Sequence, residues 1–206
     1  MLPIFVFTPN GTEIGRLDDS WKPSFSPDGT KVAFACGVDN AGNVVVVSNS
    51  EDPRPSISND IWSRTGEGTL SDRMEIVVVA TDGSSLVKVT NNDSGDWLPR
   101  WFPLDHYSSE SWVPSNFASE EPLLIESNRS GKSEIFILST TSTRKWRVSE
   151  NYDSAQSPAW SQNGNAIAFA VDDDQNKTEI VIAFNTKESS MIETGVKGRP
   201  VPWLAE

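Results

Sequence analysis

The feature that most constrains this chain is an internal repeat of about 40 residues, because repeats of this length build stacked or radial arrays of sheets. Each copy opens with acidic and polar residues, reaches a proline, and places an aromatic residue shortly after that proline. A turn and an apolar run follow. The copies open at residues 18–29, 93–103 and 153–164, and a truncated fourth copy lies at 198–204.

Each complete copy predicts four short β-strands separated by turn residues. The third strand starts with a Glu-Ile pair, at Glu75, Glu134 and Glu179. Turns ending at Gly29 and Gly164 predict hairpins, because glycine tolerates positive φ. No segment shows helical periodicity. We expect second strands at 31–35, 122–127 and 166–170, third strands at 75–79, 134–138 and 179–183, and last strands at 86–90, 145–149 and 190–193.

A single four-stranded sheet cannot bury both of its faces, so the sheets must pack on one another, and radial packing gives a β-propeller. We expect the prolines Pro23, Pro99 and Pro158 to precede each first strand, where a missing N–H does least harm. The aromatic residues that follow are predicted to fill the wedge between neighbouring sheets, with stacking on a ligand as the alternative. These residues are Phe25, Trp101 and Trp160.

The run PSFSPDG at 23–29 and the VAF at 32–34, with the later Glu-Ile strand and Asp-Gly turn, resemble the TolB-like propeller repeat, a relative of WD-type blades. The third copy matches equally well. The second departs after Pro103, where an insertion replaces Asp-Gly, and the fourth keeps only its proline and tryptophan. The resemblance covers nearly the whole chain and implies an all-β fold, a small β-propeller of four-stranded blades. It implies no particular activity, because such blades host many.

The two ends of the chain predict how the ring closes. Residues 4–7 and 13–17 fit the third and last strands of a blade, and residues 201–204 fit a first strand. We therefore expect four blades, with one blade shared between the termini, in a single propeller domain over 1–206. The alternative is an open piece of a longer propeller, which would leave edge strands and an apolar face exposed.

Two insertions interrupt the repeat, near 48–73 and 104–121. The first lies between the second and third strands of its blade, and the second between the first and second strands of the next. Loops of this length in a compact domain are usually functional or disordered. Aromatic residues favour a partner-binding surface, although both loops could instead fold back and cap neighbouring blades. The candidate partner-binding residues are Trp62, His106, Tyr107, Trp112 and Phe117.

The sequence contains no recognisable catalytic, cofactor-binding or metal-binding motif. It has one histidine and one cysteine, His106 and Cys36, which are far apart and do not suggest a zinc site or a triad. Cys36 lies in an apolar run that predicts a buried thiol. Asp172 opens an acidic run whose spacing does not fit a calcium loop, so we expect a solvated hairpin tip. A net charge of −12 with scattered basic residues argues against nucleic acid, and no segment predicts membrane insertion.

These features predict a non-enzymatic β-propeller that is monomeric alone and binds another protein through its inserted loops and channel rim. One alternative is an accessory propeller that gates a hydrolase, as in prolyl-oligopeptidase-like enzymes. Another is a propeller that binds a small ligand or a sugar. No signal peptide is visible, so a cytoplasmic location is expected by default, and a periplasmic or extracellular one if a leader has been removed.

Overall fold

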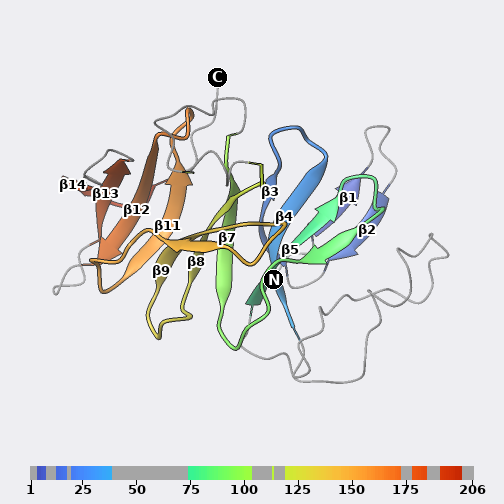
Figure 1. Ribbon diagram of the computed structural model, residues 1–206, viewed down its shortest axis with the longest axis horizontal. Coiled ribbons are helices and arrows are strands. Elements are labelled where there is room, and N and C mark those ends of the chain that lie inside the picture. The colour runs from blue at the N-terminus through green and yellow to red at the C-terminus, as the bar shows by residue number, and fades with distance from the viewer. Residues whose placement is uncertain are drawn as a thin grey trace. The chain divides into compact units, whose positions relative to one another are not determined.

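The computed structural model describes residues 4–7, 13–17, 20–38, 74–103, 113, 119–172, 178–184 and 191–200, with side chains from residue 22 onward. These residues form β-strands, turns and connecting segments, and Figure 1 shows no helix among them. The prediction of an all-β chain is therefore confirmed. No helix of the described part is long and apolar enough to cross a membrane.

The strands form three four-stranded antiparallel sheets and one two-stranded sheet. Sheet A contains β3 (Ser20–Phe25), β4 (Lys31–Gly37), β5 (Met74–Ala80) and β6 (Leu86–Lys88). Sheet B contains β7 (Asp96–Trp101), β8 (Leu123–Ser127), β9 (Glu134–Leu138) and β10 (Lys145–Arg147). Sheet C contains β11 (Ala155–Trp160), β12 (Ala166–Asp172), β13 (Thr178–Phe184) and β14 (Met191–Lys197). The predicted N-terminal strands are β1 (Ile4–Phe7) and β2 (Glu13–Leu17), which pair with each other.

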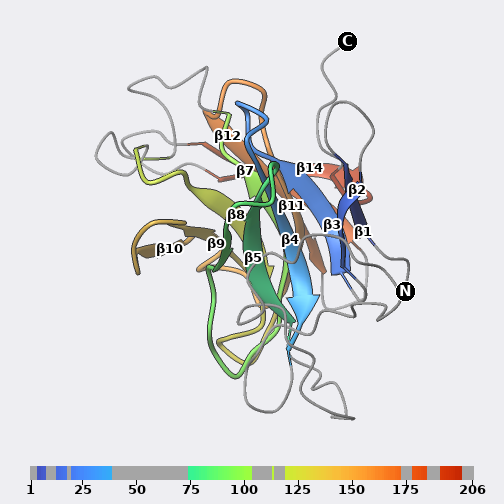
Figure 2. The same ribbon diagram turned by 90° about the vertical axis from the view of Figure 1, so that its right-hand side faces the viewer.

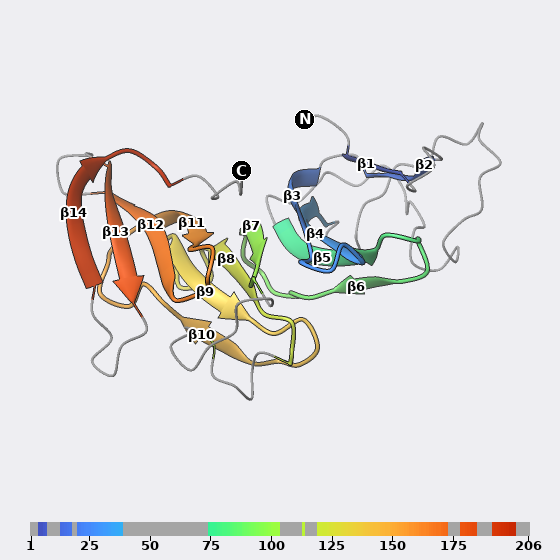
Figure 3. The same cartoon turned by 90° about the horizontal axis from the view of Figure 1, so that it is seen from above.

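Each four-stranded sheet is a simple meander, because neighbouring strands in the sheet are also neighbours in the sequence. Figure 3 shows this order clearly for sheet C, from β11 to β14. The chain divides into two compact units, Met1–Trp97 and Leu98–Glu206. The first holds the β1–β2 hairpin and sheet A. The second holds sheet C and all of sheet B except the first two residues of β7.

The repeated prolines lie inside the first strands, so the prediction that they precede them is wrong. Pro23, Pro99 and Pro158 each follow a residue with positive φ, at 54°, 53° and 55° respectively. The pairing register of β3 and β11 shifts at this point, which marks a β-bulge. A bulge leaves a backbone N–H out of the ladder, and proline has none to lose. The repeat therefore encodes a kinked first strand.

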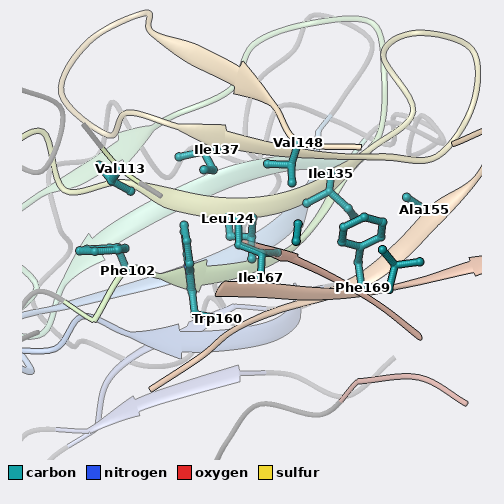
Figure 4. Packing of buried hydrophobic residues seen from close by; sticks show 12 residues of the cluster. Phe102, Val113, Leu124, Ile135, Ile137, Val148, Ala155, Trp160, Ile167 and Phe169 are labelled. Atoms are coloured by element: carbon teal, nitrogen blue, oxygen red, sulfur yellow. The ribbon is translucent and has the colours of Figure 1, made fainter. Parts of the chain in front are cut away.

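The core of the second unit lies between sheets B and C, and Figure 4 shows its side chains meeting from both sheets. Phe102 and Trp160 pack edge to face with ring centroids 5.1 Å apart. The indole Nε1 of Trp160 donates a hydrogen bond to the Arg100 carbonyl at 3.1 Å, so this tryptophan joins the two sheets. The predicted wedge role is confirmed for Trp160. Trp101 is also buried.

Phe25 does not share that environment, and the wedge prediction is wrong for it. Its side chain is 66% exposed. Among the described residues of the first unit, the only other sheet is the two-stranded β1–β2 hairpin, which leaves this ring uncovered. Sheet A instead has its own small cluster of Val32, Phe34 and Cys36 with residues of β5. Cys36 is a fully buried thiol outside any disulfide, and its burial is as predicted.

The two predicted hairpin turns are confirmed and share one hydrogen-bond pattern. Gly29 and Gly164 have φ of +70° and +69°. Ser26 Oγ donates to Asp28 Oδ1 at 2.6 Å, and Ser161 Oγ donates to Asn163 Oδ1 at 2.9 Å. The hydrogen bond from Ser26, assisted by those from Thr30, lowers the pKa of Asp28 to about 2. Asp28 is therefore a turn-stabilising carboxylate.

Candidate interaction surface

The predicted partner-binding residues Trp62, His106, Tyr107, Trp112 and Phe117 all lie outside the described residues, so their role stays a prediction. The structure does fix where their segments attach. The first connection leaves β4 and returns at β5, where Gly37 pairs with Met74. The second leaves β7 and returns at β8, and Phe102 N donates to the Pro122 carbonyl at 3.0 Å. Both insertions therefore lie between the strands that the repeat predicted.

Val113 shows how part of the second insertion is used. It is 1% exposed and belongs to the core cluster that contains Phe102 and Leu124. Figure 4 places its side chain beside that core. At this point the insertion folds back on sheet B, which favours the capping role for this position. A partner-binding role remains the prediction for the aromatic residues around it.

A carboxylate begins or nearly begins each third strand, and the matching Ser or Thr lies at the end of the sheet. In sheet A, Thr90 Oγ1 accepts from Ile76 N at 2.8 Å and donates to Glu75. In sheet B, Ser149 Oγ accepts from Ile135 N at 2.9 Å. In sheet C, Thr194 Oγ1 donates to the Ile180 carbonyl at 2.7 Å. These Ser and Thr hydroxyls link the third strand of each sheet to its last strand or to the residues just after it. The recurrence of Ser or Thr at this place in the repeat therefore has a structural cause.

Glu75 lies near a second buried acid, Asp96. Asn92 connects the two: its backbone N–H donates to Glu75 Oε1 at 2.7 Å and its side-chain amide donates to Asp96 Oδ2 at 2.8 Å. Burial raises the pKa of Glu75 against the opposing hydrogen bonds from Thr90 and Asn92, and Asp96 raises it further. Both acids are 1% exposed or less, so substrate has no access to them.

This burial predicts a pH-dependent stability that Glu75→Gln should remove. The folded pKa lies above the ordinary value of 4.5, so the folded protein holds a proton that the unfolded chain releases. Stability is highest below the unfolded pKa and is lost as pH rises through the folded pKa. Denaturant unfolding across roughly pH 4 to 7 should therefore show the wild type losing stability relative to Glu75→Gln. Glu150→Gln, at an exposed position, is the control; a constant difference for Glu75→Gln would contradict the prediction.

Two further aspartates, Asp172 and Asp153, have structural contacts. Asp172 lies at the end of β12, where it accepts hydrogen bonds from Thr178 Oγ1 at 2.9 Å and Gln156 Nε2 at 3.1 Å. Its position in a strand corrects the prediction of a solvated hairpin tip for this residue. Asp153 forms an exposed ion pair with Lys132 at 3.0 Å. Within the described ranges, no cluster of three or more His, Cys, Asp or Glu side chains could hold a metal ion.

The bulge of β11 provides a direct link between sheets B and C. Ser157, the positive-φ residue of that bulge, donates its N–H to Glu126 Oε2 at 2.9 Å. Glu126 lies on β8, and its other oxygen accepts from Ser133 Oγ at 2.8 Å. The bulge thus turns a backbone donor out of its own sheet and towards the neighbouring one. This bond, like the Trp160 contact, runs from the first strand of sheet C to sheet B.

Arg100 is a functional candidate that the sequence analysis missed. It lies on β7 two residues after the positive-φ Leu98, and its Nη1 donates to the Pro99 carbonyl at 3.0 Å. Its Nε is buried with no acceptor, and no carboxylate of the described residues pairs with the side chain. Burial lowers the pKa of Arg100. The repeat carries Ser24 and Ala159 at the matching positions, so the exception to the pattern was visible in the sequence.

Comparison with known proteins supports the fold and goes no further. No family model and no curated protein matches the chain. Among solved structures, it is similar to a TolB from Agrobacterium tumefaciens, with a TM-score of 0.57, 12% identity, and coverage of 89% of this chain and 51% of that one. A TolB from Acinetobacter baumannii gives a TM-score of 0.45 at 14% identity, with 92% and 47% coverage.

The chain therefore has a TolB-like, all-β fold in which four-stranded antiparallel sheets follow one another along the sequence. This confirms the resemblance seen in the repeat at the level of fold. The chain spans about half the length of the TolB proteins that it matches. At these identities the likeness concerns architecture alone.

Proposed function

We propose that this chain is a non-enzymatic β-propeller that binds another protein through the rim of its channel and its inserted loops. Sheets A, B and C are three blades in this proposal. The β1–β2 hairpin belongs to a fourth blade in this proposal. The first strand of that blade, predicted at residues 201–204, lies outside the described residues. The TolB-like fold, the repeated bulge and the pairing of β1 with β2 support this arrangement.

The observation that carries the proposal is the half-buried guanidinium of Arg100, which has no carboxylate partner among the described residues. The first strand of each propeller blade lies beside the central channel. A desolvated arginine without a carboxylate partner is costly, and an acidic group of a partner would satisfy its donors. Arginine is also enriched among the residues that dominate binding energy at protein interfaces. We therefore place the recognition of an acidic partner group at Arg100.

The proposal is tested by affinity capture with the immobilised chain, followed by measurement of each captured protein with purified components. We expect Arg100→Gln to weaken the purified complex by about tenfold to a hundredfold, because a desolvated charge pair is lost. Deletion of residues 53–68 is expected to abolish capture through the first insertion while the fold, followed by circular dichroism, stays intact. Lys132→Gln removes an exposed charge of the same sign and is the control. A complex whose affinity is unchanged by Arg100→Gln and by the deletion of residues 53–68 would contradict the proposal.

A further inference from the structure

The outer edge of sheet B carries an unusual group of side chains. Its last strand, β10, reads Lys145-Trp146-Arg147, and Arg144 precedes it. Three of the 17 basic residues of a chain with net charge −12 therefore lie within four positions. Trp146 is 51% exposed, and Arg144 and Lys145 are exposed as well. Of the exposed large apolar residues in the described part, Trp146 alone has a basic residue on both sides.

Among the described residues, the backbone of β10 has a hydrogen-bonded strand on one side only. Sheet B has the order β10-β9-β8-β7, so β10 is an edge strand, and Figure 2 shows it at the margin of its sheet. Ser139 N donates to the Arg144 carbonyl at 3.0 Å and Val148 N donates to the Ile135 carbonyl at 2.8 Å. These bonds set the alternation of the ladder, which directs the N–H and C=O groups of Lys145 and Arg147 away from β9.

The side chains alternate with the same period. Trp146 is opposite Ile137, whereas Lys145 and Arg147 are opposite Leu138 and Phe136. Successive residues of a strand point to opposite faces of the sheet. A strand added to this edge would therefore meet an indole on one face. On the other face it would meet Lys145 and the partly exposed Arg147, which also forms an ion pair with Glu134. Basic residues alone would serve to discourage edge pairing, but a half-exposed tryptophan between them adds an apolar contact instead.

We propose that the edge of β10 binds an extended acidic peptide segment by β-strand addition, with an acidic-apolar-acidic alternation read by Lys145, Trp146 and Arg147. The outward backbone groups of Lys145 and Arg147 hold the peptide main chain. Its apolar residue packs beside Trp146, and its carboxylates lie beside the two cations. Charge complementarity selects this occupant, because Lys145, unlike Arg144 and Arg147, has no carboxylate partner among the described residues. The proposal deepens the interaction function proposed above and rests on it.

The test uses the full chain and a labelled peptide, Gly-Ser-Glu-Val-Glu-Val-Glu-Ser-Gly, with fluorescence anisotropy at about 50 mM salt. A peptide of equal composition with the order Glu-Glu-Glu-Val-Val loses the alternation and is the first control. We expect the alternating peptide to bind at least about tenfold more tightly than the control, and to shift the emission of Trp146 in the wild type but not in Trp146→Phe. Equal binding of the two peptides would overturn the proposal.

Variants separate the edge from general charge effects. Lys145→Glu is expected to weaken binding by about tenfold, and Lys145→Pro by a similar factor through loss of an outward N–H. Lys88→Glu makes the same charge change on the outer strand of sheet A and should leave the affinity within about twofold. If Lys145→Pro fails to fold, Lys145→Glu and Lys145→Gln decide the question. Equal losses with Lys88→Glu and Lys145→Glu would overturn the proposal.

Other occupants give distinct results. Binding of vesicles rich in anionic lipid that Lys145→Glu abolishes, without peptide binding, would overturn the peptide proposal in favour of a membrane surface. A concentration-dependent dimer that Lys145→Pro dissociates, again without peptide binding, would overturn it in favour of a second copy of the chain. Arg100→Gln and the deletion of 53–68 should both leave peptide affinity unchanged. Failure of the channel-rim function is therefore distinguishable from failure of the edge site.

Discussion

Gly164→Ala is expected to destabilise the protein by about 3 kcal/mol, whereas Gly29→Ala should cost only about 1 kcal/mol. Both glycines have the same backbone conformation, with φ of +69° and +70°, so both variants carry the same strain. A Cβ at Gly29 would meet no atom within 4 Å. A Cβ at Gly164 would lie 2.6 Å from Cε2 of Phe102. The difference between the variants therefore isolates the contact with the Phe102 ring.

That ring has little room to move, because Phe102 is fully buried and packs edge to face against Trp160. Thermal and denaturant unfolding of both variants would measure the difference, with a loss of roughly 6 to 12 °C expected for Gly164→Ala. The double variant Gly164→Ala with Phe102→Leu should lose less stability than the sum of the losses in the two single variants. Equal losses at the two glycines would show that the turn conformation alone decides their stability.

Arg147→Met is expected to cost about 3 kcal/mol, because it leaves the carboxylate of Glu134 buried without its cation. Glu134 is 0% exposed and forms an ion pair with Arg147, whose side chain is about one-third exposed. One oxygen of Glu134 and the Nε of Arg147 already lack partners. The buried pair is therefore incompletely satisfied, and its desolvation is only partly offset.

The double variant Glu134→Leu with Arg147→Met should recover most of that loss, since it removes both buried charges and fills the space with apolar atoms. Lys145→Met is the matched control on the same strand: it removes an exposed cation and should change stability by less than about 0.5 kcal/mol. The free energies of unfolding of Arg147→Met, Glu134→Leu and the double variant, from urea titrations, give the coupling of the pair. Additive losses at the two positions would contradict a buried, coupled pair.

Second and third strands were predicted to within two residues at most ends, as in β5 and β9, because each is an apolar run bounded by turn residues. The last strands were less accurate. Those predicted at 86–90 and 145–149 end at Lys88 and Arg147. Thr90 and Ser149 leave the ladder because their hydroxyls accept hydrogen bonds from the third strand. In sheet C the last strand runs further than predicted, to Lys197.

The candidate site could be anticipated only in part. Aromatic residues in the insertions were visible, since unusual composition in a long loop is a local signal, and their role stays a prediction. Arg100 was missed because its departure from Ser24 and Ala159 in the repeat, although visible, does not show that the side chain is buried. Its significance comes from burial beside Pro99 without an acceptor for Nε. The edge of β10 was missed for a similar reason, because which backbone groups face outward depends on the register with β9.

The sequence patterns alone predict a repeated set of four-stranded meanders with tight glycine turns. The alternation of apolar and polar residues, the turn residues and the repeat spacing depend on residues near one another in the sequence. They can therefore be recognised without knowledge of the fold. Tertiary contacts were needed to show that the repeated prolines lie within the first strands. They were also needed to show that Trp160 packs between two sheets while Phe25 is exposed. These outcomes depend on which sheet covers each side chain, and those contacts join residues far apart in the sequence.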